Sequence, residues 1–168
     1  PDDRSNTLST ALRLDRRFDA ERVRAAVAAA VARHPALRTT IRDGRQHVHD
    51  EARFDWDVTD DLTEVARRPF DLAEGPLVRA AAVLTPATTT LLIACHHAIA
   101  DYLSLRVVLT DVVAELVGDR DFALTGDTTA DPRVWAAEQA RHLATPETRA
   151  RLAELADRWR PVRNELLF

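Results

Sequence analysis

The sequence has no lysine, no methionine and a single cysteine among its 168 residues. One cysteine excludes an intramolecular disulfide framework and is typical of a reducing compartment, so we expect a cytoplasmic location. Methionine is absent even from position 1, which predicts that the chain begins inside a longer gene product or has lost its start. All 23 basic residues are arginine, and this bias, with abundant Ala, Val, Leu and Asp, indicates a GC-rich bacterial genome.

An excess of positive charge is also absent, because the formal net charge is −4. Such a chain offers no basic field to nucleic acid or to anionic lipid. No stretch approaches the roughly 20 apolar residues of a membrane span. A hydrophobic share of 46% with 30% charged residues is ordinary for a globular chain, here one domain or two small lobes. We therefore expect neither nucleic acid nor a membrane as a partner.

Apolar patterning predicts strands and helices that alternate along the chain. The predicted strands lie in 7–14, in 36–50 about an Asp-Gly turn, and in 77–97 about a Thr-Pro-Ala-Thr turn. The predicted helices lie at 18–34, 102–116, 133–144 and 147–159, with a short one in the segment from 57 and a loop at 118–132. The order predicts an α/β (α+β) fold with a mixed sheet flanked by helices.

Local signals predict where two of these helices begin and end. Asp19 is the expected N-cap of the first long helix, and Pro35 ends that helix. Thr59 or Asp60 is the expected cap of the short helix. The second strand of 77–97 is apolar on both faces, which indicates an interior strand.

Two adjacent histidines, His96 and His97, end that interior strand, and Asp101 follows four residues later. Side chains alternate along a strand, so Cys95 and His97 share one face while His96 points to the other. Adjacent histidines are therefore poorly placed to share a metal ion, and no second cluster of ligands exists, so we expect no metal. A Cys95–His97 thiol dyad is also disfavoured, since neighbours at this spacing point in parallel.

A catalytic base is the remaining chemical interpretation of this pair. An imidazole suits proton transfer near neutral pH, and the end of a buried strand presents His97 to a cleft from a rigid support. Asp101 can orient a ring nitrogen or pair with a buried arginine. The alternative is that both histidines only pack within the core.

Four ordered stretches resemble condensation domains of nonribosomal peptide synthetases, in the superfamily of chloramphenicol-acetyltransferase-like acyltransferases. HHAIADYLS (96–104) resembles the family's HHxxxDG motif. DAERVRAAVAAAVARHPALRTTI (19–41) is similar to its helix and RHxxLRTxF motif, and RPFDLAEGPLVRAAAV (68–83) to PFDLxxGPLxRxxL. LADRWRPV (155–162) resembles the helix that ends in YWxxxL. The likeness runs over nearly the whole chain.

The resemblance implies a chloramphenicol-acetyltransferase-like lobe, over residues 1–168, that is the N-terminal half of a two-lobed condensation fold. His97 would be the catalytic base, and His96 and Asp101 would support the site. Asp101 would form an ion pair with Arg33 or Arg38, Arg79 being the third candidate. Tyr102 and Ser104 would lie at the channel of the acceptor.

The resemblance also implies the chemistry and the partners. The domain would join a carrier-bound acyl or peptidyl thioester to an acceptor amine, forming an amide. No cofactor would be bound, because 4′-phosphopantetheine arms of carrier proteins deliver the substrates. The partners would be peptidyl or acyl carrier protein domains and a C-terminal condensation lobe, in this chain or another.

Two departures from the family pattern keep alternatives open. Tyr102 stands where the family has Gly, and VWAAEQA (134–140) lacks the Tyr and Asp of YxDFAxW. The second lobe is absent from this chain. The alternatives are a non-catalytic condensation-like module that docks a carrier or recruits a tailoring enzyme, and an ester-forming or coenzyme-A-dependent acyltransferase of the same superfamily.

Overall fold

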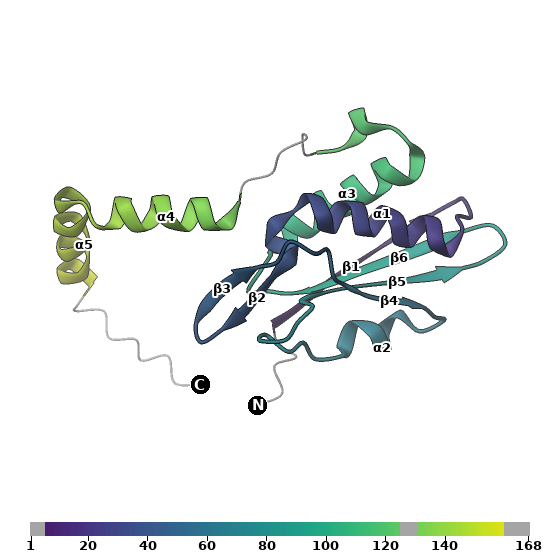
Figure 1. Cartoon of the computed structure of the whole chain (residues 1–168), viewed down its shortest axis with the longest axis horizontal. Coiled ribbons are helices and arrows are strands. Elements are labelled where there is room, and N and C mark those ends of the chain that lie inside the picture. The colour runs from purple at the N-terminus through teal and green to yellow at the C-terminus, as the bar shows by residue number, and fades with distance from the viewer. Residues whose placement is uncertain (1–5, 125–130, 160–168) are drawn as a thin grey trace. The chain divides into compact units, whose positions relative to one another are not determined.

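A four-stranded mixed sheet lies at the centre of the computed structural model, which describes residues 6–124 and 131–159. The strand order is β1–β6–β5–β4 (Figure 1). The bounds of these strands are Thr7–Leu14 for β1, Asp55–Val58 for β4, Val78–Leu84 for β5 and Thr89–His96 for β6. β6 pairs antiparallel with both β1 and β5, whereas β4 pairs parallel with β5. The predicted strands at 7–14 and within 77–97 are confirmed, and β6 is an interior strand as predicted.

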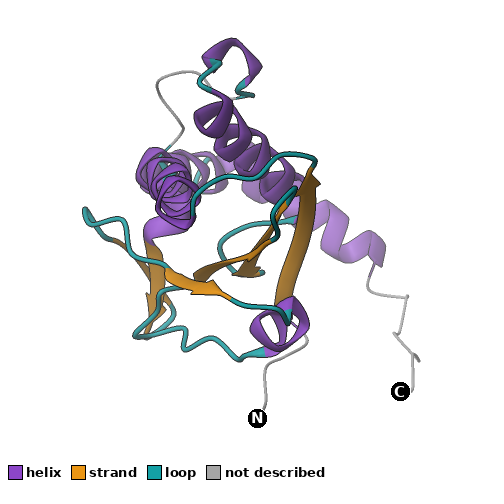
Figure 2. Ribbon diagram, turned by 90° about the vertical axis from the view of Figure 1, so that its right-hand side faces the viewer, coloured by secondary structure: helices purple, strands orange, loops and turns teal. Residues whose placement is uncertain are grey.

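Helices cover both faces of this sheet (Figure 2). α1 (Ala20–Arg33) and α3 (Tyr102–Val117) pack on one face, where the main apolar core includes Val27, Ile93 and Leu105. The short α2 (Leu62–Arg67) lies on the other face, where Val65 contacts Ala81 and Leu92. The predicted mixed sheet flanked by helices is therefore confirmed.

α1 begins after Asp19 and ends before Pro35, as predicted. The Asp19 side chain makes no capping hydrogen bond, so Asp19 holds the N-cap position by its extended backbone alone. A 3₁₀ turn, η2 (Pro35–Arg38), links α1 to the next strand, and a second 3₁₀ turn, η3 (Arg120–Phe122), lies within the predicted loop at 118–132. Residues 125–130 of that loop lie outside the described residues.

The Asp-Gly turn closes a hairpin of β2 (Thr39–Arg42) and β3 (Arg45–Val48). Asp43 and Gly44 both have positive φ angles, 52° and 70°, which is the backbone of the favoured two-residue hairpin turn. Thr40 lies opposite His47, and Arg42 lies opposite Arg45. Residues opposite one another share a face, so one side of the hairpin carries polar and basic side chains.

The structure of the segment that starts at residue 57 was only partly predicted from the sequence. Residues Asp55–Val58 form strand β4 rather than the approach to a helix, because they pair with Arg79–Ala82. The cap of α2 is Asp61, not Thr59 or Asp60: its carboxylate accepts hydrogen bonds from the backbone N–H groups of Thr63 and Glu64. The local pattern contains no sign of the distant partner that makes these four residues a strand.

The chain divides into two compact units at Asp131. Taken by itself, the second unit holds α4 (Pro132–Leu143) and α5 (Pro146–Trp159), which confirms both predicted helices. The family-like segment 155–162 runs past Trp159, beyond the described residues. Within 6–124 and 131–159, no helix is long and apolar enough to cross a membrane.

Candidate functional site

The two adjacent histidines occupy different environments at the end of β6. His96 is the last residue of the strand and is only 4% exposed. Its ring meets the edge of the Phe70 ring, with 6.4 Å between centroids and an angle of 84°. Cys95 lies on the opposite face, in the core under α1 and α3. Strand alternation thus separates Cys95 from His96, as the sequence predicts.

The backbone contacts of His96 define which ring nitrogen carries its proton. The backbone N–H of Ala98 donates to His96 Nδ1 at 3.0 Å, so Nδ1 is an unprotonated acceptor. His96 is therefore the tautomer with its proton on Nε2. This hydrogen bond holds the turn after β6 in place, so the His96 ring has a structural role.

His97 is exposed, and its ring Nδ1 has the opposite hydrogen-bonding role to that of His96. Its backbone N–H donates to the Asn6 carbonyl at 2.7 Å, which ties the turn after β6 to the start of β1. Its Nδ1 lies 3.1 Å from the Ala100 carbonyl oxygen, and a carbonyl can only accept, so Nδ1 carries the proton. The lone pair of neutral His97 is then on Nε2, which has no hydrogen-bond partner within the described residues. This is the arrangement that a general base needs.

Asp101 caps α3 and does not pair with an arginine among the described residues. Its carboxylate accepts from the backbone N–H of Ser104 at 2.7 Å and from the Ser104 hydroxyl at 2.6 Å. These two hydrogen bonds, the hydroxyl first, lower the pKa of Asp101. The Ala100 carbonyl, rather than Asp101, bonds the His97 ring. Ser104, predicted at the acceptor channel, turns its hydroxyl to this cap.

The arginines predicted as partners of Asp101 bind elsewhere. Arg33 bridges to Glu115 at 2.5 Å and to Asp111 at 3.6 Å. Arg38 donates to the backbone carbonyl of His49. The predicted ion pair between Asp101 and Arg33 or Arg38 is therefore not formed, because a residue one helical turn away satisfies the carboxylate first.

Arg79 likewise has its own partners, on the α2 face of the sheet. It is 4% exposed, and its guanidinium donates to the carbonyls of Val65, Arg68 and Pro69 at 3.0–3.3 Å. It also contacts Asp55 at 3.3 Å. Burial lowers the pKa of Arg79, and the Asp55 carboxylate opposes that shift. Arg79 thus fixes the segment that leads to Phe70.

The same guanidinium stacks on the Phe70 ring, 4.4 Å from its centroid. Phe70 in turn meets His96, so Arg79, Phe70 and His96 form a continuous contact path to the turn that carries His97. The sequence shows the RPFD segment and Arg79 but not this contact between them.

Cys95 is a buried thiol without catalytic character. Burial is the main cause that raises its pKa to about 12, and the nearby Asp101 charge adds to the shift. A thiol with such a pKa is almost fully protonated near neutrality and is a poor nucleophile. The contacts of Cys95 support the sequence argument against a thiol dyad.

Tyr102 and Leu103 open α3 and project into solvent, 59% and 66% exposed. They directly follow Asp101, so an exposed aromatic and an exposed aliphatic side chain come just after the turn that carries His97. No group of three or more His, Cys, Asp or Glu side chains in the described parts of the chain is arranged to hold a metal ion.

Comparison with known proteins identifies the fold and the family of this chain. A condensation domain described in work on chain release from the enacyloxin polyketide synthase superposes with a TM-score of 0.74 and 27% identity, over 94% of this chain and 34% of that one. The X-domain of teicoplanin biosynthesis gives a TM-score of 0.62 and 26% identity, over 84% of this chain and 36% of that one. The lobe therefore has the chloramphenicol-acetyltransferase-like fold expected from the sequence.

The family profile named Condensation domain matches residues 1–115, and this chain belongs to that family. A probable non-canonical nonribosomal peptide synthetase, CymA of Salinispora arenicola, is 33% identical over 155 residues, 82% of this chain. Tyrocidine synthase 2 of Brevibacillus parabrevis is 32% identical over 134 residues, 73% of this chain. The matched part of this chain spans 2% of the length of the first relative and 4% of the second.

Proposed function

We propose that the chain is the N-terminal lobe of a condensation domain that joins a carrier-bound acyl or peptidyl thioester to an acceptor amine. The observation that carries the proposal is the opposite hydrogen-bonding role of Nδ1 in the paired histidines. His96 accepts a backbone N–H at Nδ1, while His97 donates its Nδ1–H to a backbone carbonyl and leaves Nε2 without a partner in the described residues, on an exposed turn. Family membership supplies the reaction class, an acyltransferase.

In the proposed reaction, the acceptor nitrogen attacks the thioester carbonyl carbon. His97 Nε2 accepts the proton that this nitrogen loses, and the Ala100 carbonyl stabilises the resulting imidazolium through Nδ1–H. The C–N bond forms, the C–S bond breaks, and the imidazolium returns its proton to the leaving sulfur. One amine and one thioester thus become one amide and one thiol.

The partners follow from the same proposal. The thioester and the acceptor would arrive on 4′-phosphopantetheine arms of carrier protein domains, and the lobe itself would bind no cofactor. A C-terminal lobe, on this or another chain, would supply the opposite wall of the site, since orientation of both substrates contributes several kcal/mol to such reactions. The location would be cytoplasmic, where such synthetases load their carriers.

The test is condensation by the parent synthetase with His97→Ala and His97→Gln, measured as product formed from carrier-loaded donors. We expect a loss of about 10²-fold or more for both variants, the usual contribution of a general base. His142→Ala, an exposed histidine of α4, is the matched control and should leave the rate unchanged. Unchanged product formation with His97→Ala would contradict the base role. Coenzyme A thioesters in place of loaded carriers would reveal the coenzyme-A-dependent alternative.

A second candidate function rests on Tyr102 and on one relative. The X-domain described in complex with OxyB from teicoplanin biosynthesis is 30% identical, with a TM-score of 0.58 over 74% of this chain and 30% of that one. A non-catalytic lobe that recruits a second enzyme is the corresponding proposal for this chain. In that case His97→Ala would leave product formation intact, whereas substitution of the exposed Tyr102 and Leu103 would weaken capture of the recruited enzyme.

A further inference from the structure

A polar cleft lies between the β2–β3 hairpin and the loop at 73–76, apart from the histidine pair. Two adjoining hollows make up the cleft, and both are lined by Thr40, His49, Arg53 and Glu74. The loop can approach the hairpin this closely because of Gly75. A Cβ at this position would lie 2.7 Å from the Thr40 methyl group, and the φ of +59° also favours glycine.

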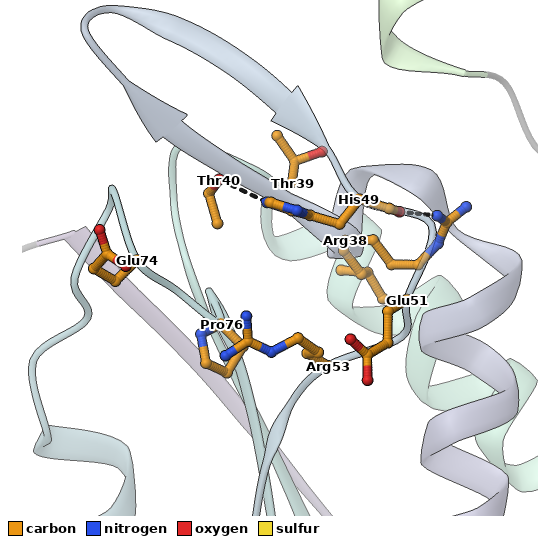
Figure 3. Close-up of a pocket in the computed structure, with 9 residues that line it drawn as sticks. Arg38, Thr39, Thr40, His49, Glu51, Arg53, Glu74 and Pro76 are labelled. Atoms are coloured by element: carbon orange, nitrogen blue, oxygen red, sulfur yellow. Dashed lines mark hydrogen bonds between the residues drawn. The ribbon is translucent and has the colours of Figure 1, made fainter.

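Most charged groups along the cleft already have partners. Arg42 pairs with Glu74 at 2.8 Å, and Arg38 donates to the His49 carbonyl. On the hairpin side, the Thr40 hydroxyl and His49 Nε2 lie 2.8 Å apart, and Thr40 is only 7% exposed (Figure 3). This hydroxyl and imidazole are therefore a preformed pair of hydrogen-bonding groups on one wall.

Arg53 differs from the other arginines of the cleft. No hydrogen bond or ion pair joins its guanidinium to any residue within the described parts of the chain. Figure 3 shows this guanidinium on the side of the hollow opposite Thr40 and His49, while the Glu51 carboxylate points away from Thr40. One unpaired cation thus faces a hydroxyl and an imidazole across the hollow.

We propose that this cleft binds a phosphate group. Arg53 would contact it from one wall, and the Thr40 hydroxyl would donate from the other, with His49 Nε2–H donating to the Thr40 oxygen. Donors on opposite walls suit a tetrahedral phosphate, whose oxygens point in several directions, better than a planar carboxylate. The two hollows are small, about 20 Å³ and about 210 Å³, and together they stay below the roughly 300–1,000 Å³ typical of sites for drug-sized ligands, so a group as small as phosphate suits them better.

The proposed phosphate site does not depend on the proposed condensation chemistry. It does adjoin the segment that pairs with β6, the strand that ends at His96. Pro76 lines the hollow, and the next residue, Leu77, accepts the backbone N–H of His96 at 3.1 Å. A phosphate in the cleft would therefore rest against the segment that pairs with the end of β6.

The experiment is a titration of the 168-residue chain followed by NMR chemical shifts at constant ionic strength. Inorganic phosphate, glycerol 3-phosphate and acetate are the three probes. We expect saturable shifts at Thr40 and His49 with phosphate and at most weak ones with acetate. Saturation by inorganic phosphate alone supports a free ion as the natural ligand, and saturation by both phosphate probes supports a phosphate ester.

Three variants make the result specific. Arg53→Ala should weaken phosphate binding at least about tenfold, because one charge-assisted contact is lost. Arg45→Ala removes the same charge from an exposed position on the β2–β3 hairpin that lines neither hollow, so the phosphate affinity of this variant should change less than about twofold. Glu51→Gln should tighten binding, because it removes a nearby negative charge.

Equal losses from Arg53→Ala and Arg45→Ala would overturn the proposal, because they would indicate only a general effect of charge. Acetate that binds as tightly as phosphate, or shifts that do not saturate with either phosphate probe, would overturn it as well. Arg53 is exposed on a loop, so a folded Arg53→Ala variant is expected, and its backbone NMR spectrum confirms this before titration.

Discussion

Replacement of Asp111 by alanine should destabilise the lobe more than replacement of Asp101. Asp111 is 0% exposed and lies on the apolar face of α3. Its carboxylate contacts His34 at 2.8 Å and Arg33 at 3.6 Å, and it accepts the backbone N–H of Leu124 at 3.1 Å. One side chain thus joins the end of α1, the middle of α3 and the segment after η3.

The magnitude follows from what alanine leaves behind. Removing one partner of a buried ion pair costs about 3–5 kcal/mol, because the other charge stays buried without compensation. Arg33 retains Glu115 at 2.5 Å, so the lower end of that range, about 3 kcal/mol, is expected. With a urea m-value of about 1–3 kcal/mol/M, the unfolding midpoint should fall by roughly 1–3 M.

The assay is urea unfolding followed by far-ultraviolet circular dichroism. Asp111→Asn keeps an acceptor for Leu124 and should lose less than Asp111→Ala. Asp121→Ala, an exposed carboxylate in η3, is the matched control and should leave the midpoint in place. The reasoning fails if Asp111→Ala costs less than about 1 kcal/mol, or if the exposed cap Asp101→Ala shifts the midpoint as far.

Two further predictions concern the other buried groups near the site. Arg79→Met should lower the free energy of unfolding by about 3 kcal/mol, since one buried and two partly buried carbonyls lose their donor. A loss under about 1 kcal/mol in the same urea assay would contradict this bonding scheme. Cys95, with a pKa of about 12 in the fold against 9.0 as the reference, should be alkylated at pH 8 about a thousandfold more slowly than in urea, as judged by mass spectrometry. Similar native and unfolded rates would show that the thiol is accessible and ionised.

The sequence predicted the elements whose signal is local. Strand alternation, helical spacing and the Asp43-Gly44 turn can each be recognised within a few residues. The structure contains the strands, the helices and the hairpin that these patterns predicted. Strand β4 was missed because only its pairing with β5, more than twenty residues away, makes it a strand. A strand of only four residues, DWDV, is too short to show a periodic pattern that can be recognised.

The candidate site shows the same division. The opposite orientations of Cys95 and His96 follow from strand alternation and were predicted. The partner of Asp101 is an exception: Ser104 lies only three residues on, so its signal is local, but the sequence argument assigned Asp101 to a distant arginine instead of to the N-cap of the following helix. Asp111 carried a usable signal, namely a carboxylate in line with Val108 and Val112 on the apolar face of a predicted helix. Its partners Arg33 and His34 depend on tertiary packing and leave no such mark.

The hydrogen bond from the backbone N–H of His97 to the carbonyl of Asn6 makes the position of His97 depend on β1, which begins at the next residue, Thr7. Thr7 lies opposite His96, and the pairing runs without a break to Leu14 opposite Thr89. A single residue inserted into or deleted from β1 would reverse the faces of that strand, or else pull the carbonyl of Asn6 away from His97. A fragment of this family that is cut a few residues into β1 would therefore keep both histidines in its sequence and still lose the contact that places the second one.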